Sequence, residues 1–176
     1  MTMDRPERLF RRDETASLKE TIILEASEAD YSALLNHNAP RNLTLPDTPI
    51  ASLGVLQMLA DVATSVRPIF SPASWLIVEA GEVVGLCSIT RPPQAGTIDI
   101  GYGIAPSRHR RGIATRAIGH VVSWAHSRPE IAIVTAETGR ANQASQSVLI
   151  RNGFVVIGER IDPEDGELIC WQRPVG

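Results

Sequence analysis

A strand, a basic turn and a helix follow one another without a break between Thr97 and Ala125, and no other segment restricts the fold as much. The turn RHRRGIA places the first unpaired backbone N–H groups of the helix beside arginine side chains. Such a helix start, at the positive end of the helix dipole, binds anions such as phosphate. A solvated basic turn would show the same pattern, so spacing alone leaves both interpretations open. The helix after Gly112 has an apolar face formed by Ala114, Ala117, Ile118, Val121 and Ala125.

Strand-like and helix-like patterns alternate along the rest of the chain. Helices are predicted after Ser27, from Asp47-Thr48-Pro49, from Gly112 and over 143–152, and Ser27 with Asp30 forms a variant of the capping box. The order β-α-α-β-β-β-α-β-α-β-β mixes hairpins with crossover helices, which predicts one α+β or α/β sheet domain for 176 residues. The predicted strands are 21–26, 75–79, 83–89, 97–104, 131–136, 154–161 and 167–172.

Composition excludes several classes of function. The formal net charge of −3 removes the general phosphate attraction of a nucleic-acid binder, and Lys19, the only lysine, cannot complete a Gly-Lys-Ser/Thr phosphate loop. The two cysteines and four histidines show no metal-ligand spacing, so we expect no metal site. No apolar run reaches the roughly 18 residues of a membrane span. We therefore expect a flexible arm over 1–19, a domain over 20–176, a cytoplasmic location and neither membrane nor nucleic acid as a partner.

Two motifs in this chain resemble those of the Gcn5-related N-acetyltransferase (GNAT) family. HRRGIA, from His109 to Ala114, is similar to the family's pyrophosphate signature R/Q-x-x-G-x-G/A, with histidine where arginine or glutamine is usual. After an intervening strand, NQASQSVLIRNGF, from Asn142 to Phe154, is similar to the family's N-x-x-S-x-x-V-L-x-x-x-G-F stretch. The resemblance extends over roughly residues 20 to 174 and points to the branch that acetylates ribosomal-protein amino termini.

The resemblance implies both a fold and a reaction. The fold is an α/β sandwich with a mixed, mostly antiparallel sheet that is splayed between its fourth and fifth strands and has helices on both faces. The reaction is direct transfer of an acetyl group from acetyl-CoA to a primary amine on a peptide terminus, a ribosomal protein or a small molecule. A backbone N–H near Ile104 would polarise the thioester carbonyl. The implied coenzyme contacts are Gly103, Ile104, Ala105, His109, Arg110, Arg111, Gly112, Ile113, Ala114, Thr115, Asn142 and Ser145.

The groups that would move protons are less clearly marked. An amine must lose a proton before it attacks, and Asp99, Glu137, Glu159 or a chain of waters are the candidate acceptors. Many family members use a tyrosine to assist the departing thiolate, but Leu149 occupies that position here. Ser145 matches the serine of the ribosomal-protein branch, and its hydroxyl is expected to hydrogen-bond the thiolate. A serine bonded to its own helix is the structural alternative.

Two other functions are compatible with parts of the sequence. A non-catalytic acyl-CoA-binding or sensing module would keep the phosphate turn, and Leu149 favours that interpretation, whereas Ser145 and Asp99 argue against it. A dinucleotide-binding oxidoreductase is disfavoured because Gly101 and Gly103 lack a third glycine at the required spacing. The acceptor amine stays open, and a homodimer is kept as a hypothesis.

Overall fold

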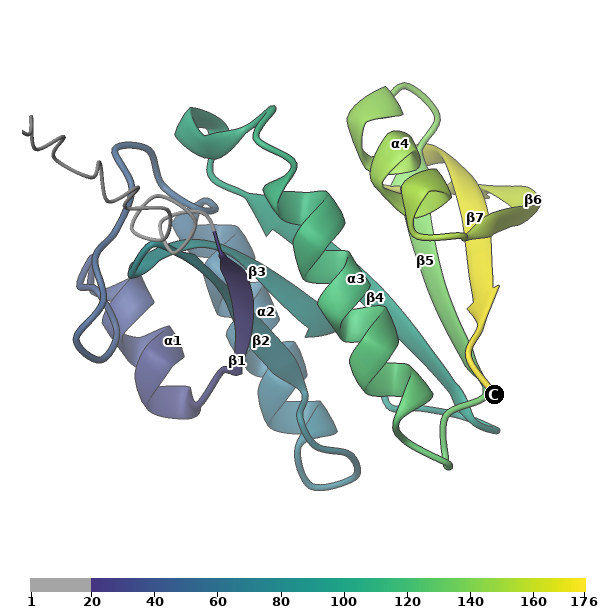
Figure 1. Ribbon diagram of the computed structural model, residues 1–176, viewed down its shortest axis with the longest axis horizontal. Coiled ribbons are helices and arrows are strands. Elements are labelled where there is room, and N and C mark those ends of the chain that lie inside the picture. The colour runs from purple at the N-terminus through teal and green to yellow at the C-terminus, as the bar shows by residue number, and fades with distance from the viewer. Residues whose placement is uncertain (1–19) are drawn as a thin grey trace, which may run out of the picture.

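The computed structural model describes residues 20–176, which form one mixed sheet with helices on both faces (Figure 1). The predicted flexible arm, 1–19, lies outside the described residues. Helices α1 and α2 cover one face of the sheet, and α3 and α4 cover the other. The elements are β1 (Thr21–Glu25), α1 (Glu28–Leu35), α2 (Leu53–Val66), β2 (Ser74–Glu79), β3 (Glu82–Ile89), β4 (Thr97–Ile104), α3 (Ile113–His126), β5 (Ile133–Gly139), α4 (Gln143–Arg151), β6 (Val155–Asp162) and β7 (Gly166–Pro174).

The order of helices and strands agrees with the one predicted, and so does the fold class. The sheet has the strand order β1-β2-β3-β4-β5-β7-β6, in which only β4 and β5 run parallel. The capping box at the start of α1 is complete, because the Ser27 hydroxyl accepts from the Asp30 N–H while the Asp30 carboxylate accepts from the Ser27 N–H. Local signals were therefore sufficient for most of the elements.

The start of α2 was predicted wrongly. The sequence Asp47-Thr48-Pro49 was expected to open this helix, but α2 begins at Leu53 with Ser52 as its N-cap. Thr48 instead bonds Ser107 at 3.0 Å, and the Asp47 carboxylate accepts from Arg108 at 3.1 Å. The side chains that looked like helix caps are thus occupied by contacts with the turn that follows β4.

The sheet opens between β4 and β5. These strands pair from Thr97 with Ile133 to Ile100 with Ala136, and the pairing then ends although both strands continue. Figure 1 shows them diverging toward α4. This splay, predicted from the family resemblance, leaves the backbone edge of β4 beyond Ile100 without a neighbouring strand. We call this unpaired region, between β4 beyond Ile100 and β5 beyond Ala136, the gap.

A glycine on β3 permits the path that β4 takes beside the gap. Gly85 pairs with Ile104, and a Cβ atom added at Gly85 would lie 2.2 Å from the Gly103 carbonyl oxygen and 2.8 Å from Ile104 Cδ1. The end of β4 therefore passes closer to β3 than any other residue at position 85 would allow. Among residues 20–176, no helix is both long and apolar enough to cross a membrane.

Candidate active site

The turn before α3 presents a set of free backbone amides. Gly112, the N-cap of α3, has φ 72°, and Arg110 has φ 61°. Both residues thus occupy the left-handed region, which turns the chain sharply into the helix. None of the N–H groups from Arg110 to Thr115 donates a hydrogen bond within residues 20–176. These free amides lie at the positive end of the α3 dipole, an arrangement that suits an anion.

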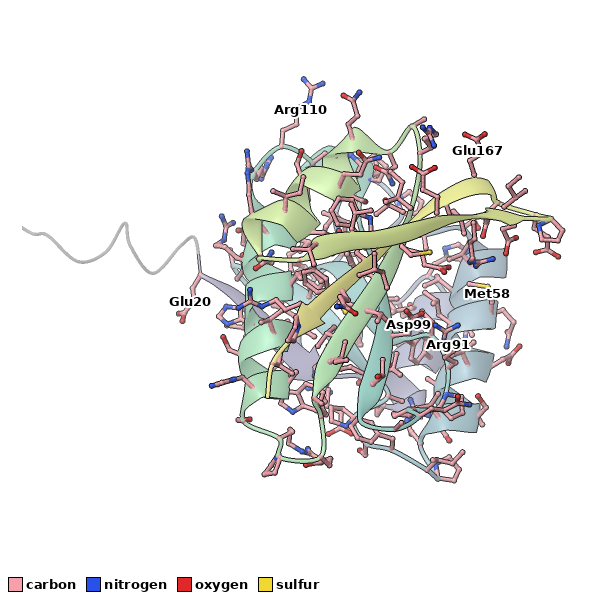
Figure 2. The ribbon with its side chains drawn as sticks, turned by 90° about the vertical axis from the view of Figure 1, so that its right-hand side faces the viewer. Glu20, Met58, Arg91, Asp99, Arg110 and Glu167 are labelled. Atoms are coloured by element: carbon pink, nitrogen blue, oxygen red, sulfur yellow. The ribbon has the colours of Figure 1, made fainter. Side chains whose placement is uncertain are left out.

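Two arginines near this turn have structural partners. Arg116 donates to the Arg111 carbonyl at 3.0 Å and to Glu79 at 2.7 Å, which fastens the turn to the end of β2. Arg108 donates to both oxygens of Glu82, at 2.9 and 2.6 Å, and this pairing raises the pKa of the guanidinium. The charge of Arg108 is therefore balanced, and the anion would meet the exposed Arg110, which Figure 2 shows pointing outward.

A pocket of about 590 Å³ lies beside the turn, between the end of β4 and α4. Every predicted coenzyme contact lines this pocket except Ala105. Ala105 has a fully buried side chain, its N–H donates to Val84 O and its carbonyl accepts from the Arg108 N–H, so its contact with the coenzyme stays a prediction. The members that do line it are Gly103, Ile104, His109, Arg110, Arg111, Gly112, Ile113, Ala114, Thr115, Asn142 and Ser145.

The backbone of β4 offers hydrogen-bonding groups to the gap at alternate residues. Since the Ala105 N–H faces β3, the alternation of a strand turns the backbone groups of Ile104 and Tyr102 toward the gap. The His109 ring donates to the Ile104 carbonyl at 2.7 Å, which holds this ring at the mouth of the gap. The N–H groups of Ile104 and Tyr102 are therefore the amides on this part of β4 that can meet an extended ligand.

Helix α4 supplies the other wall of the pocket. The Asn142 side chain accepts from the Ser145 N–H at 3.1 Å, so Asn142 is the N-cap of this helix. The Ser145 hydroxyl has no hydrogen bond to its own helix among the described residues, in contrast to Ser147, which donates to the Gln143 carbonyl. Leu149 is fully buried and faces the core. Ser145 is thus a hydroxyl of α4 that lines the pocket and has no bond to its own helix.

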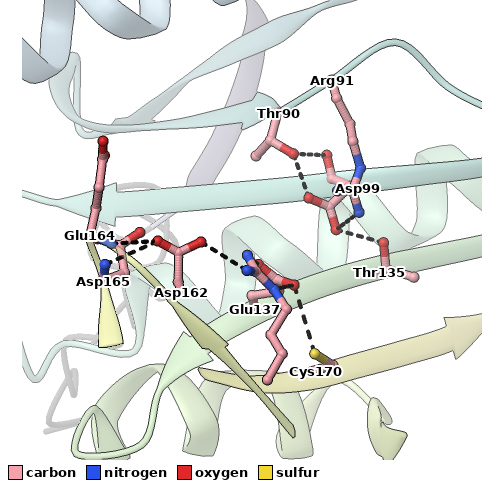
Figure 3. Close-up of polar contacts among 10 residues, drawn as sticks. Thr90, Arg91, Asp99, Thr135, Glu137, Asp162, Glu164, Asp165 and Cys170 are labelled. Atoms are coloured by element: carbon pink, nitrogen blue, oxygen red, sulfur yellow. Dashed lines mark hydrogen bonds and ion pairs between the residues drawn. The ribbon is translucent and has the colours of Figure 1, made fainter. Parts of the chain in front are cut away.

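Asp99 lies on the opposite face of the sheet, held by three side chains (Figure 3). It accepts from the hydroxyls of Thr90 and Thr135, the latter at 2.6 Å, and forms an ion pair with Arg91 at 3.5 Å. Asp99 is 8% exposed, whereas the Arg91 side chain is 64% exposed. On this face Tyr31 of α1 contacts Ser88 on β3, the strand next to β4.

Glu137 shares this face with Asp99. Asp99 is in register with Thr135, and Glu137 follows two residues later on β5. Arg160 donates to both Glu137 oxygens, at 2.7 and 2.6 Å, and this pairing lowers the pKa of the carboxyl. The Cys170 thiol lies 3.7 Å from the same carboxylate (Figure 3). Asp99 and Glu137 therefore form a pair of carboxylates at the edge of the gap, each with an arginine partner.

Glu159, the third carboxylate named as a base, does not belong to this group. It is in register with Ile169 on β7, one residue away from the Cys170 that faces Glu137, so its side chain points to the other face of the sheet. There it forms an exposed ion pair with Arg140 at 2.7 Å. The strand alternation excludes Glu159 as a partner of Asp99.

Several residues of the site were missed by sequence reasoning. Arg116, Tyr102 and Arg91 were not singled out as site residues. Each acts through a contact with a residue at least eight positions away, as in the bond from the Tyr102 hydroxyl to the Ser145 carbonyl. Local spacing carries no signal for such contacts. Among residues 20–176, no group of three or more His, Cys, Asp or Glu side chains is arranged to hold a metal ion.

Comparison with known sequences identifies the family. Residues 22–155 match the model described as the acetyltransferase (GNAT) domain. The uncharacterized N-acetyltransferase YjdG of Bacillus subtilis is 33% identical over 86 residues, which are 47% of this chain and 51% of that protein. The chain thus spans about half the length of this curated relative.

Solved structures share the fold at low sequence identity. A GNAT-family acetyltransferase from Streptococcus pneumoniae superposes with a TM-score of 0.63 at 16% identity, over 89% of this chain and 100% of that one. A ribosomal-protein α-N-acetyltransferase in complex with coenzyme A gives 0.65 at 18% identity, over 88% and 94%. An aminoglycoside acetyltransferase in complex with coenzyme A gives 0.64 at 14%, over 88% and 95%. Since the domain model covers most of the chain and the fold agrees, the chain belongs to the GNAT acetyltransferase family.

Proposed function

We propose that this protein transfers the acetyl group of acetyl-CoA to a primary amine by direct attack. The observation that carries the proposal is the continuous pocket that joins the free amides of the α3 turn to the unpaired edge of β4 and to Ser145. A diphosphate suits the amides, and an extended pantetheine arm suits an open strand edge. Structural neighbours with coenzyme A bound support this assignment.

The chemistry follows from the groups around the gap. The amine nitrogen attacks the thioester carbonyl, the new C–N bond forms, and the C–S bond breaks to release the coenzyme thiolate. The Ile104 N–H stabilises the negative charge that develops on the carbonyl oxygen. The Ser145 hydroxyl donates a hydrogen bond to the departing thiolate, and the amine proton leaves to a base on the opposite face of the sheet.

Asp99 is the better candidate for that base. Glu137 is a weaker proton acceptor, because the bidentate bond from Arg160 lowers its pKa. Asp99 is held by neutral hydroxyls of Thr90 and Thr135 and by a single outer contact with the exposed Arg91. An arriving amine can displace Arg91 more easily than it can break the two-point pairing of Glu137. Transfer through water to Asp99 is an equivalent route.

Coenzyme binding is tested by Gly112→Asp. The added carboxylate would repel the bound diphosphate and keep it away from the backbone amides of the turn. We therefore expect at least a 10-fold loss of coenzyme A affinity in calorimetry. Gly166→Asp is the matched control, because Gly166 also has positive φ, at 75°, but is the first residue of β7, with no atom within 4 Å of its Cβ position. Equal affinities in the two folded variants would remove the pyrophosphate assignment.

The base is tested by the pH profile of Asp99→Asn. Only about 0.04% of an ordinary lysine amine is neutral at pH 7 and about 4% at pH 9, so a variant that lacks only the base should recover relative to wild type as pH rises. Glu159→Gln, on the other face, should leave the profile unchanged. A loss that is the same from pH 6.5 to 9.5 would assign Asp99 a structural role.

Acyl-CoA binding without catalysis is the alternative function, and the burial of Leu149 where many relatives have a tyrosine favours it. The enzyme and the non-catalytic binder can be distinguished by measuring thiol release from acetyl-CoA. The amines offered are an amino acid, a polyamine, an aminoglycoside and a peptide with a free amino terminus. Turnover of any amine supports the enzyme, and Ser145→Ala should then lower kcat by roughly 10- to 100-fold. Binding of coenzyme A without turnover of any of them supports the sensor. The cytoplasmic location and the homodimer remain predictions.

A further inference from the structure

The side chain of Tyr102 extends across the gap, and the proposed reaction assigns it no role. Tyr102 lies on β4 two residues after Ile100, where pairing with β5 ends. Its side chain lines the coenzyme pocket, and its hydroxyl donates to the backbone carbonyl of Ser145 at 3.0 Å. A side chain from one side of the gap is thus bonded to the first turn of the helix on the other side.

Few polar contacts hold α4 in place. Among side-chain hydrogen bonds of residues 20–176, one connects this helix to β4 and one connects its C-cap to α3, while Gln146 of the helix donates to the Gly139 and Arg140 carbonyls at the end of β5. The first is the Tyr102 contact at the start of α4, and the second runs from Asn152 to the Thr115 carbonyl at its end, at 3.1 Å. The cap formed by Asn142 lies within the same segment and cannot fix its distance from β4. Among these side-chain bonds, the one from Tyr102 is therefore the bond that ties the first turn of α4 directly to β4.

The Tyr102 hydroxyl is poorly suited to be a proton donor itself. Burial raises the pKa of this phenol, so proton transfer to a thiolate, whose thiol titrates near 8.5, is unfavourable. Its hydrogen is moreover directed at the Ser145 carbonyl. What the contact does control is the place of Ser145, whose own hydroxyl has no bond to its helix.

We propose that Tyr102 is a positioning residue, which holds Ser145 at the distance from β4 that thiolate departure requires. The proposal rests on the proposed acetyl transfer. Because the carbonyl of Ser145 and its hydroxyl belong to one residue, a shift of the first turn of α4 moves both. Loss of the Tyr102 bond should therefore weaken catalysis through Ser145 and leave the free amides at Gly112 unaffected.

The test compares Tyr102→Phe with Tyr31→Phe. Tyr31 is the only other tyrosine and is buried, and its hydroxyl lies 3.5 Å from the Ser88 hydroxyl on the opposite face of the sheet. Tyr31→Phe therefore controls for the loss of a tyrosine hydroxyl elsewhere in the protein. With the fastest amine of the panel, Tyr102→Phe should lower kcat by about 3- to 10-fold, the loss expected for one hydrogen bond, with KM for acetyl-CoA nearly unchanged. An unchanged kcat, or a rise in KM alone, would overturn the proposal.

A double variant asks whether Tyr102 acts through Ser145. In a Ser145→Ala background, Tyr102→Phe should cause no further loss of kcat, because the group that it positions is gone. Losses that multiply would show that Tyr102 acts independently, and the positioning role would then be wrong.

A measurement without turnover separates this proposal from the proposed function. Backbone hydrogen exchange in the first turn of α4 should be faster in Tyr102→Phe than in wild type or Tyr31→Phe. If no amine is acetylated but exchange rises as expected, the proposed function fails and the Tyr102 contact stands. If amines are acetylated and exchange is unchanged, the positioning role fails alone.

Discussion

Strands β3 and β6 are equal in length and opposite in surroundings. Along β3 seven of eight residues are buried, whereas along β6 seven of eight are exposed. Helices cover both faces of the sheet at β3, while β6 is an edge strand that pairs only with β7 (Figure 1). The first half of the molecule thus holds most of the core, and the second half is a thinner layer attached to it. The pocket and both carboxylates lie where the two halves meet.

The sequences of the two strands explain the contrast. VVGLCSI in β3 is a nearly continuous apolar run, which is typical of a strand buried on both faces. In β6, the sequence VVIGERID ends in charged residues. Among them, Arg160 forms ion pairs with Glu137 and Asp162 and does not pack into a core. Changes in β6 should therefore alter the site more readily than the stability of the fold.

The largest effect is expected from the core of the first half. Leu76 on β2 is fully buried, and Leu76→Ala should reduce the free energy of unfolding by about 2 to 5 kcal/mol. Ile161 on β6 is 81% exposed, and Ile161→Ala should change it by less than about 0.5 kcal/mol. Urea unfolding of both variants measures the difference. Similar losses would mean that β6 carries as much of the core as β2.

A smaller effect is expected at the path of β4. Gly85→Ala would press a methyl group against the Gly103 carbonyl, so we expect a loss of roughly 1 to 3 kcal/mol together with weaker coenzyme A binding. Gly54→Ala is the control. A Cβ atom added at Gly54, in α2, would meet nothing within 4 Å, and alanine is more favourable than glycine in a helix by about 1 kcal/mol. A Gly85→Ala protein with normal stability and affinity would show that the close approach of β4 to β3 is dispensable.

The smallest effect is expected from Arg160→Gln and depends on pH. Arg160 lowers the pKa of Glu137 below its ordinary 4.5, so the pair stabilises the folded state above that pH and the contribution is lost as pH falls through the lowered value. The denaturation midpoints of wild type and variant should therefore differ most near pH 7 and converge toward pH 2, where Asp162, whose pKa is lowered to about 2, is also about half protonated. Because the pair is partly exposed, the difference should be small. A difference that grows in acid would contradict the assignment.

The sequence predicted what local signals specify. The capping box at Ser27, strand β4 and the glycine start of α3 were all found because the determining residues lie within a few positions of one another. The start of α2 was missed because Asp47 and Thr48 bond to a turn some sixty residues later.

The two sides of the site differed in how far they could be predicted. The residues predicted for the coenzyme side line one pocket, except Ala105, because most of them belong to one continuous turn and helix; their contacts with the coenzyme stay a prediction. The carboxylate side was predicted only as a set of candidates. Thr90, Thr135 and Arg160 approach Asp99 and Glu137 from different strands, so only the register of the sheet could choose among the acids.

The position of β7 has a consequence for the order in which the protein can fold. β7 follows β6 in the chain but lies between β5 and β6. During synthesis the amino-terminal part of a chain emerges first, and the hairpins β2–β3 and β3–β4 can close from neighbouring segments. β6 has no place in the sheet until β7 has been added next to β5. The pairing of Arg160 with Glu137 thus requires that β7 has already docked beside β5.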